Sequence, residues 1–399
     1  MRLLNIDFIF KLVILCSILE GAQAWFFWDY WFTLYFNVVI TAISIIYFMK
    51  KVNIRNYNIH YILCLLILTS IAISITDKSI NGIIGIIITF FPFYILLGCD
   101  HETINKHFIF CQKCLSFIFV PSIILHIILL FSNIPPLFIS TNDASIQYSY
   151  NNYIILVKNF QLYEYRFCSI FLEPGYLGTL CAFMLFADNY NFSKKANKII
   201  LITLLFSMSL AGYLTAIIGY IALNIRINKK SIKKIFILVC LIIGTYLFSQ
   251  NYNNGDNNIN HALFERLVID EDKGIKGNNR FTETTDEYFE WYLKSDFFWI
   301  GLGEKDIFDI NNYNIQNNLG VISGAGYKIY LLKYGILRLI FIFIAYLLLA
   351  LRYKNKKYSF IFLLLIILTF IQAAYPLSTS WLIPYTFGLK KKKSYHIRK

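Results

Sequence analysis

Residues 199–225 read IILITLLFSMSLAGYLTAIIGYIALNI, a run of 27 residues without a charged side chain. As one helix the run would be about 40 Å long, whereas the hydrocarbon core of a membrane is about 30 Å thick. It is basic at both ends, with Lys198 before it and Arg226 after it. We therefore predict a hairpin of two short helices that turns near residues 209–212 and keeps both basic ends on one side of a membrane. The alternative, a single long crossing, would put the second basic cluster on the opposite side.

Similar apolar runs recur along the whole chain. Of its 399 residues, 57% are hydrophobic and only 15% are charged, whereas about a quarter of the residues of a soluble domain are charged. Many runs have about the 17 to 25 residues that cross a bilayer as a helix. The composition therefore excludes a soluble enzyme and predicts an all-α integral membrane protein, a polytopic bundle that forms one domain over residues 1–399.

The positions of the basic residues predict the topology. A formal net charge of +14 would by itself suit a nucleic-acid-binding protein. Most lysines and arginines, however, form short clusters between the apolar runs, as expected of cytoplasmic loops, so no nucleic-acid partner is predicted. We predict about twelve transmembrane helices with both termini in the cytoplasm, at residues 4–23, 31–49, 58–76, 80–98, 115–132, 168–187, the two arms of 199–225, 235–250, 334–351, 358–375 and 377–389.

The N-terminal run has a second interpretation. Arg2, an apolar stretch and Ala22-Gln23-Ala24 have the pattern of a secretory signal peptide with its cleavage site. Because Lys11 interrupts that stretch and another run follows closely, an uncleaved first helix is favoured.

The cysteines give no sign of a metal or redox site. The eight cysteines lie almost entirely in or beside the apolar runs, which is not the pattern of a disulfide framework. Cys111 and Cys114 form a C-x-x-C pair without a second pair or a histidine cluster, so we interpret them as packing residues. No metal and no other cofactor is predicted.

Two long polar segments separate the runs, and long loops of this kind tend to carry function. The first loop, residues 133–167, is rich in asparagine and tyrosine, and the second loop, residues 251–322, holds 13 acidic but only six basic residues. Both are expected on the periplasmic side. In the second loop, residues 282–294 predict a helix capped by Thr282, with acidic residues in its first turn. Its aromatic residues would form one apolar face on the membrane surface or over a cavity, and they are Phe281, Tyr288, Phe289, Trp291 and Tyr292.

The strongest local signal for a functional site stands where the first loop ends, in residues 166–178, which read RFCSIFLEPGYLG. A carboxylate inside an apolar run, here Glu173, is costly to bury and by default marks a functional site. Pro174 disfavours helical geometry at Glu173 and suits the first position of a helix, so we predict a helix that begins at Pro174 with Glu173 as its cap. The alternative is that Glu173 is only a cap, paired with Arg166.

Four basic residues are candidates for binding an anionic substrate. Arg166 and Arg280 are the first choice, because a guanidinium stays charged and holds phosphate oxygens in a fixed fork. The alternative for each is an ion pair with a carboxylate of its own loop. Lys328 and Arg338 follow the second loop and are predicted to bind substrate as well. For Arg338 the alternative is a side chain that extends along the apolar surface to water.

The order of these features resembles the O-antigen polymerase (Wzy-type) family, within the O-antigen polymerase and ligase group of membrane glycosyltransferases. The resemblance runs over residues 160–350. Its motifs are Arg166 followed by Phe171-Leu172-Glu173-Pro174-Gly175, the uncharged hairpin with Ser209 and Gly212 at its turn, Arg280 ahead of an aromatic helix and Gly301-Leu302-Gly303, and Leu331-Leu332-Lys333-Tyr334-Gly335-Ile336 opening the next run.

The resemblance implies a polymerase of lipid-linked repeat units at the periplasmic face of a bacterial inner membrane, in the biosynthesis of lipopolysaccharide O-antigen or a related surface polysaccharide. Such an enzyme moves a growing glycan from undecaprenyl pyrophosphate onto the end sugar of a new lipid-linked repeat unit. Arg166 and Arg280 would stabilise the charge of the departing pyrophosphate, and Glu173 would deprotonate or orient the acceptor hydroxyl. The expected partners are the lipid-linked donor and acceptor, membrane lipid, and a flippase and chain-length regulator of the same pathway.

A lipid-linked oligosaccharide flippase or transporter and an O-antigen ligase are the alternatives. A transporter has no need of a long acidic outer loop, and the sequence shows no internal repeat. Ligases of this group have a His-Asn pair shortly before the glycine of the last motif, where this chain reads Ser323-Gly324-Ala325-Gly326-Tyr327. His261, the only histidine of the second loop, stands too early. The sequence therefore favours a polymerase.

Overall fold

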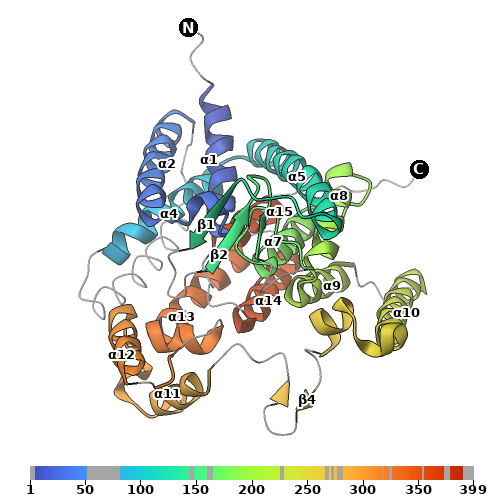
Figure 1. Ribbon diagram of the computed structural model, residues 1–399. Coiled ribbons are helices and arrows are strands. Elements are labelled where there is room, and N and C mark those ends of the chain that lie inside the picture. The colour runs from blue at the N-terminus through green and yellow to red at the C-terminus, as the bar shows by residue number, and fades with distance from the viewer. Residues whose placement is uncertain are drawn as a thin grey trace.

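The computed structural model describes residues 5–51, 81–142, 148–159, 165–224, 229–265, 269–270, 274–275, 282–317, 319–322, 326–352, 355–372 and 378–389. This part of the chain is mostly helical, with small sheets in the two long loops (Figure 1). The main helices are α1 (Ile6–Gly21), α2 (Tyr30–Lys51), α4 (Asn81–Gly98), α5 (His101–Phe131), α7 (Pro174–Ala187), α8 (Lys195–Ser207), α9 (Leu210–Asn224), α10 (Lys229–Asn251), α13 (Tyr327–Arg352), α14 (Lys356–Gln372) and α15 (Thr379–Leu389).

These helices coincide with the predicted segments, although α5 begins at His101 rather than at residue 115 and α13 at Tyr327 rather than at residue 334. They occupy eleven of the twelve, and the remaining one, residues 58–76, lies outside the described residues. By length and composition, three helices of the described chain can cross a membrane, namely Tyr30–Lys50, His101–Phe131 and Tyr327–Leu351, and shorter apolar helices lie at Ile88–Gly98, Pro174–Ala187 and Leu210–Asn224. The helical class is therefore confirmed, and the described chain holds helices long and apolar enough to cross a membrane. The count of twelve crossings stays a prediction.

The uncharged run 199–225 is broken into two helices, as predicted. Helix α8 ends at Ser207, Met208 adopts the left-handed conformation with φ 44° and ψ 39°, and α9 begins at Leu210. Left-handed backbone at a non-glycine residue ends a helix, because L-residues tolerate it only singly.

Both arms of this run pack on α7, in opposite directions. At the start of α8, the Asn197 amide donates a hydrogen bond to Asp188, which ends α7. At the start of α9, a Cβ atom on Gly212 would stand 2.7 Å from the carbonyl carbon of Gly178, which is near the beginning of α7. The chain therefore reverses between the two arms, and the predicted hairpin is confirmed.

Helices that follow one another in the chain, such as α7, α8 and α9, run in opposite directions, which gathers predicted cytoplasmic lysines at one end of the bundle. The Lys357 ammonium at the start of α14 donates to the carbonyl of Leu223 at the end of α9. Lys194, just before α8, pairs with Asp188 and lies over the ring of Phe108 in α5. We call this the basic end, and we call the opposite end, where α5 finishes and α7 and α13 begin, the loop end.

A buried polar network ties three helices together at the basic end. The side chain of Asp188 is 1% exposed, and it accepts the Lys194 ammonium at 2.8 Å and the Asn197 amide at 2.7 Å. Gln112 of α5 donates to Asn197 at 2.7 Å. Buried polar groups stabilise a fold only when their partners are in place, so the network fixes α5, α7 and α8 relative to one another.

The first loop forms an antiparallel sheet that the sequence analysis did not predict. Its strands, in the order β1-β2-β3, are β1 (Phe138–Asn142), β2 (Tyr148–Asn152) and β3 (Val157–Lys158). The connector between α1 and α2, which contains the short helix η1 (Trp25–Phe27), packs beside it. The indole of Trp25 donates to the carbonyl of Ile154 at 2.8 Å. The sheet and the connector together cover part of the loop end.

The second loop contains the helix predicted from its sequence. Helix α11 (Glu283–Leu293) begins after Thr282, whose hydroxyl accepts a hydrogen bond from the amide of Thr285 at 3.2 Å. Glu283 and Asp286 stand in its first turn, so the predicted cap and the acidic first turn are confirmed. The other elements of this loop are η2 (Tyr252–Gly255), η3 (Asn260–Phe264), β4 (Ile269–Asp270), β5 (Gly274–Ile275), η6 (Asp296–Phe298) and α12 (Glu304–Gln316).

The aromatic residues of α11 divide between the core and the surface. Phe289 and Tyr292 are buried, and the Phe289 ring centroid lies 5.9 Å from that of Tyr327 at the start of α13. Trp291 is 48% exposed, and Phe281 lies outside the described residues. The face that holds Phe289 and Tyr292 therefore rests on the start of α13.

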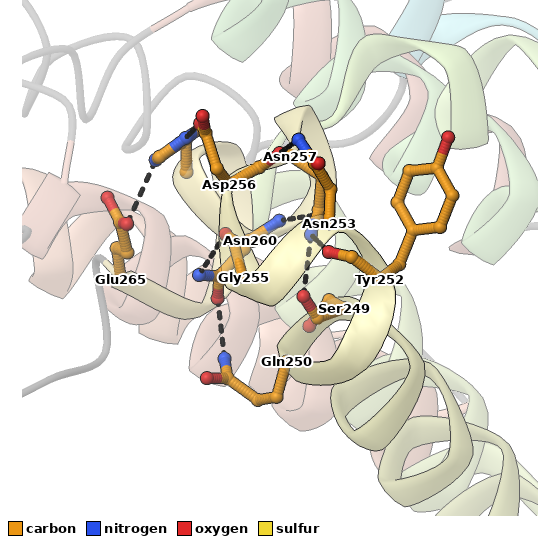
Figure 2. A network of polar contacts seen from close by, with 10 residues as sticks. Ser249, Gln250, Tyr252, Asn253, Gly255, Asp256, Asn257, Asn260 and Glu265 are labelled. Atoms are coloured by element: carbon orange, nitrogen blue, oxygen red, sulfur yellow. Dashed lines mark hydrogen bonds and ion pairs between the residues drawn. The ribbon is translucent and has the colours of Figure 1, made fainter.

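A compact polar network follows the end of α10, which lies to one side of the bundle (Figures 1 and 2). Gln250 donates to the side-chain oxygen of Asn260 at 2.7 Å. The ring of His261 lies between two carboxylates, 2.9 Å from Glu265 and 2.9 Å from Asp256. Because both carboxylates favour the imidazolium, their hydrogen bonds raise the pKa of His261, with that of Glu265 the larger cause.

Candidate functional site

The helix that follows the predicted site begins where the sequence indicates. Pro174 is the first residue of α7, and Glu173 is its N-cap with extended backbone, φ −140° and ψ 151°. The Glu173 side chain is half-buried and makes no capping hydrogen bond to the helix. Glu173 therefore occupies the N-cap position, but its carboxylate accepts no hydrogen bond from the first turn of α7.

The chain before Glu173 is held in place by the connector between α1 and α2. The amide of Trp25 donates to the carbonyl of Ile170 at 2.8 Å, and the amide of Leu172 donates to the carbonyl of Gln23 at 3.0 Å. Since these are backbone bonds between segments remote in sequence, they fix the path of the chain that leads to Glu173.

Two further segments hold the same stretch. The amide of Phe167 donates to the carbonyl of Phe206 at the end of α8, at 3.2 Å. The amide of Val157 in β3 donates to the carbonyl of Ser169 at 2.7 Å. The residues from 165 to 173 are therefore fixed by the connector, by α8 and by β3, which is the preorganisation that a binding or catalytic site requires.

Charged side chains gather around this stretch. The thiol of Cys168 is buried and lies within electrostatic range of Arg166, Lys158 and Glu173. Arg166 is half-buried, and its charge also reaches Tyr213 in the first turn of α9. The structure thus brings the predicted residues Arg166 and Glu173 into one region, together with a second cation.

That second cation, Lys158, was not predicted. It stands in β3 and is only 2% exposed. In the sequence it is one lysine in a polar loop, and such residues are usually solvated, since lysine is almost never fully buried unless paired. Its burial follows from the sheet and from the path of residues 165–173, neither of which the sequence pattern revealed.

Small residues bring the turn of the α8–α9 hairpin against the start of α7. A Cβ atom on Gly178 would stand 2.5 Å from the Cβ of Ser209. The Ser209 hydroxyl is buried and accepts a hydrogen bond from the amide of Gly212 at 3.2 Å. Helices approach this closely only where side chains are small. Two motifs of the sequence analysis, the start of α7 and the uncharged turn, are therefore in direct contact.

A second pair of motifs meets at a break in α13. Gly335 interrupts this helix with φ 70° and ψ 170°. The glycine loop of the second loop enters the break, and the amide of Leu302 donates to the carbonyl of Leu332 at 2.8 Å. Gly301, with φ 80°, lies directly against Gly335. The glycine turn and the opening of the following run are thus one structural unit.

Lys328 is engaged in holding α11 onto α13. Its ammonium lies 2.7 Å from the carboxylate of Asp286 and 5.5 Å from the ring centroid of Phe289. Its side chain is 18% exposed. The geometry gives Lys328 a structural role, and its part in substrate binding stays a prediction.

The other two predicted cations have different outcomes. Arg280 lies outside the described residues. Arg338 is only 9% exposed, so its side chain does not extend along the outer surface. Arg338 lies over the ring of Tyr330. The centroid of that ring is 5.3 Å from the ring centroid of Phe370, near the end of α14. Because α14 begins at the basic end, Arg338 and Arg166 both belong to the loop end of the bundle.

The loop end therefore carries two polar regions, one around Arg166 and one around Arg338. The first combines two cations with a carboxylate at a helix start, which suits binding of an anion next to a group that accepts a proton. Within the described residues, no group of three or more His, Cys, Asp or Glu side chains could hold a metal ion. Comparisons with models of protein families, with curated proteins and with solved structures gave no match.

Proposed function

We propose that this protein is a membrane glycosyltransferase that joins polyprenyl-diphosphate-linked oligosaccharide repeat units into a longer glycan, the activity of the O-antigen polymerases that it resembles. The observation that supports the proposal is the pairing of its motifs. The Glu173-Pro174 helix start contacts the uncharged turn through Gly178, and the Gly301 turn contacts Gly335. Motifs that are scattered along the sequence thus form two regions at one end of the bundle, and within each region the two motifs are in direct contact.

The reaction would use the charges around the start of α7. The bond between the anomeric carbon of the donor glycan and its diphosphate oxygen breaks, and the acceptor hydroxyl oxygen forms the new bond to that carbon. The negative charge left on the lipid diphosphate would be stabilised by Arg166 and Lys158, because fixed cations act most strongly where charge develops. The acceptor proton would pass to the carboxylate of Glu173. Arg280 is proposed as a further cation for the same diphosphate.

We place this site at the periplasmic face of a bacterial inner membrane, with twelve crossings and both termini in the cytoplasm. The alternation of the helices supports this arrangement, because Lys194 and Lys357 lie at the basic end. The positive-inside rule assigns that end to the cytoplasm. The loop end, with Arg166 and the two long loops, would then face the periplasm.

Deletion of the gene tests the proposal. Cell-surface polysaccharide, separated on a gel, should collapse from a ladder to a single repeat unit, and the lipid-linked single repeat should accumulate on the outer face of the membrane. Accumulation on the inner face would instead indicate a flippase. Polymer that forms on the lipid carrier without reaching its final acceptor would indicate a ligase. An unchanged ladder would refute all three.

A further inference from the structure

Arg338 is a buried cation that forms no ion pair within the described chain. Its guanidinium carbon lies 4.0 Å from the ring centroid of Tyr334 and 5.4 Å from that of Tyr330. Stacking on aromatic faces stabilises a guanidinium but uses none of its N–H groups. Its Nε and Nη1 atoms are buried and have no hydrogen-bond partner among the described residues.

Tyr330 adds another unsatisfied donor to the same cluster. Its side chain is 3% exposed, and its hydroxyl is buried without a hydrogen-bond partner in the described structure. Buried polar atoms are nearly always paired in folded proteins, because removing them from water without a partner is costly. Because the Arg338 guanidinium lies over the ring of Tyr330, the three unsatisfied donor atoms belong to one cluster, and we take them as donors for an acceptor group.

One carboxylate beside this cluster is already engaged. Glu304, at the start of α12, accepts a hydrogen bond from the hydroxyl of Tyr334 and lies 3.8 Å from the ammonium of Lys333. The cluster therefore contains two cations, Arg338 and Lys333, and one carboxylate shared by other donors. Among the described residues its donors outnumber its acceptors, which is the composition of a site for an anion.

The break in α13 places the cluster at the loop end. Helical side chains lean toward the N-terminus of their helix, so Arg338 leans back over the break at Gly335 and onto Tyr334. The Gly301 turn supports the same break from the second loop. The guanidinium therefore faces the part of the bundle where lipid-linked substrates would arrive.

We propose that Arg338 and Tyr330 form an oxyanion site that binds a phosphate group of a lipid-linked substrate, separate from the region around Arg166. This inference rests on the proposed function, because it assigns the diphosphates of the lipid-linked donor and of the lipid-linked acceptor to two separate anion sites. The shared chemistry is a diphosphate oxyanion, and its source is a membrane lipid or a free diphosphate.

Binding of farnesyl diphosphate to the purified full-length protein in lipid nanodiscs tests this site. The measurement is made in an Arg166→Gln background, so that binding at the first region, which also holds Lys158, is weakened. Arg338→Gln should weaken binding about tenfold or more, and Tyr330→Phe about fivefold, as expected for loss of a charged and a neutral hydrogen bond. Tyr358→Phe is the matched control, because Tyr358 also has a buried hydroxyl without a partner in the described chain but lies at the basic end. It should leave the affinity unchanged.

Inorganic pyrophosphate and glucuronate serve as further probes. If pyrophosphate binds with the same dependence on Arg338, the site recognises the free diphosphate, and if only farnesyl diphosphate binds, it needs the lipid as well; both results support the site. Glucuronate binding without diphosphate binding would overturn it. So would an affinity for farnesyl diphosphate that is the same in Arg338→Gln and in Tyr330→Phe as in the Arg166→Gln background alone. Tyr330→Phe removes one oxygen and keeps the ring. A deletion strain that keeps its polymer refutes the proposed function and leaves this binding result standing.

Discussion

Gly301 and Gly335 lie against each other so closely that a Cβ atom on Gly335 would stand 2.6 Å from the amide nitrogen of Gly301. Both residues have positive φ, 80° and 70°, a conformation that side chains other than glycine rarely adopt. The contact joins the second loop to the break in α13. A change at either glycine should therefore act on both.

We expect Gly335→Ala to destabilise the protein by about 2 kcal/mol or more, because the new methyl group meets backbone atoms and the backbone conformation is strained for alanine. Gly244→Ala in α10 is the control, since a Cβ there would meet nothing within 4 Å. That change should be neutral or stabilise the helix by up to about 1 kcal/mol. Thermal unfolding in detergent measures both, and equal midpoints for the two variants would contradict the contact.

The packing of α7 on α9 gives a second comparison between glycines. Gly178→Ala should destabilise the protein by about 1–3 kcal/mol, because its methyl group would stand 2.5 Å from the Cβ of Ser209. At Gly175, three residues earlier, the nearest atom is a Glu173 oxygen at 3.9 Å, so Gly175→Ala should change stability by less than about 0.5 kcal/mol. If both variants unfold at the wild-type temperature, the close approach of the hairpin turn to α7 is wrong.

Replacing the proposed diphosphate-binding arginines should abolish long polysaccharide. Arg166→Ala and Arg280→Ala are each expected to lower the rate about 100-fold or more, since each removes a cation aimed at developing charge. Lys106→Ala is the control, because Lys106 is exposed and pairs with Glu102 at the basic end. Polysaccharide gels report the activity, and immunoblots of the membrane fraction show that the variants are present. Normal ladders from both arginine variants would end the catalytic assignment.

The environment of His261 predicts a pH-dependent effect near the end of α10. Because Glu265 and Asp256 raise its pKa above the ordinary value of about 6.5, the stabilisation from charged His261 is complete below that value and is lost as pH rises through the folded-state pKa. Residues 252–264 should exchange amide hydrogens faster in His261→Gln than in wild type at about pH 6, and at equal rates well above the raised pKa. Residues 304–316 serve as the internal control. A difference that grows with rising pH would have the wrong sign.

The topology can be tested with epitope tags at the two ends of the bundle. A tag inserted after Asn317, which caps the end of α12, should bind antibody in intact spheroplasts because the loop end is predicted to be periplasmic. A tag between Asn191 and Ser193, in the turn that precedes α8, should bind only after permeabilisation. The reverse pattern would place the Arg166 region in the cytosol and remove the proposed function.

Features with a local chemical cause could be predicted from the sequence. The start of α7 at Pro174 and the cap of α11 at Thr282 depend on residues within one turn of the helix, and both are confirmed. The break of the run 199–225 was predictable because its length and its two basic ends conflict with one crossing.

Features that depend on remote segments could not be predicted. Lys158 is buried in the sheet of the first loop, where its strand pairs with β2, and Lys328 meets Asp286 across two elements of the fold. The glycines at 301 and 335 each indicate a turn, but only the packed structure shows that the two turns are in contact. The sequence marked Arg338 as unusual without indicating that two tyrosines stack on it.

The shortness of the α8–α9 hairpin has a consequence for the surrounding bilayer. Its arms have 13 and 15 residues, so each is only about 20 Å long, and Leu205 and Leu214 on its surface are exposed. In the proposed membrane arrangement, acyl chains beside it would have to shorten or tilt to match this height. If the substrate is the proposed polyprenyl diphosphate, a headgroup layer that dips toward Arg166 would let its long tail stay in the membrane while its charged end reaches the protein from the side.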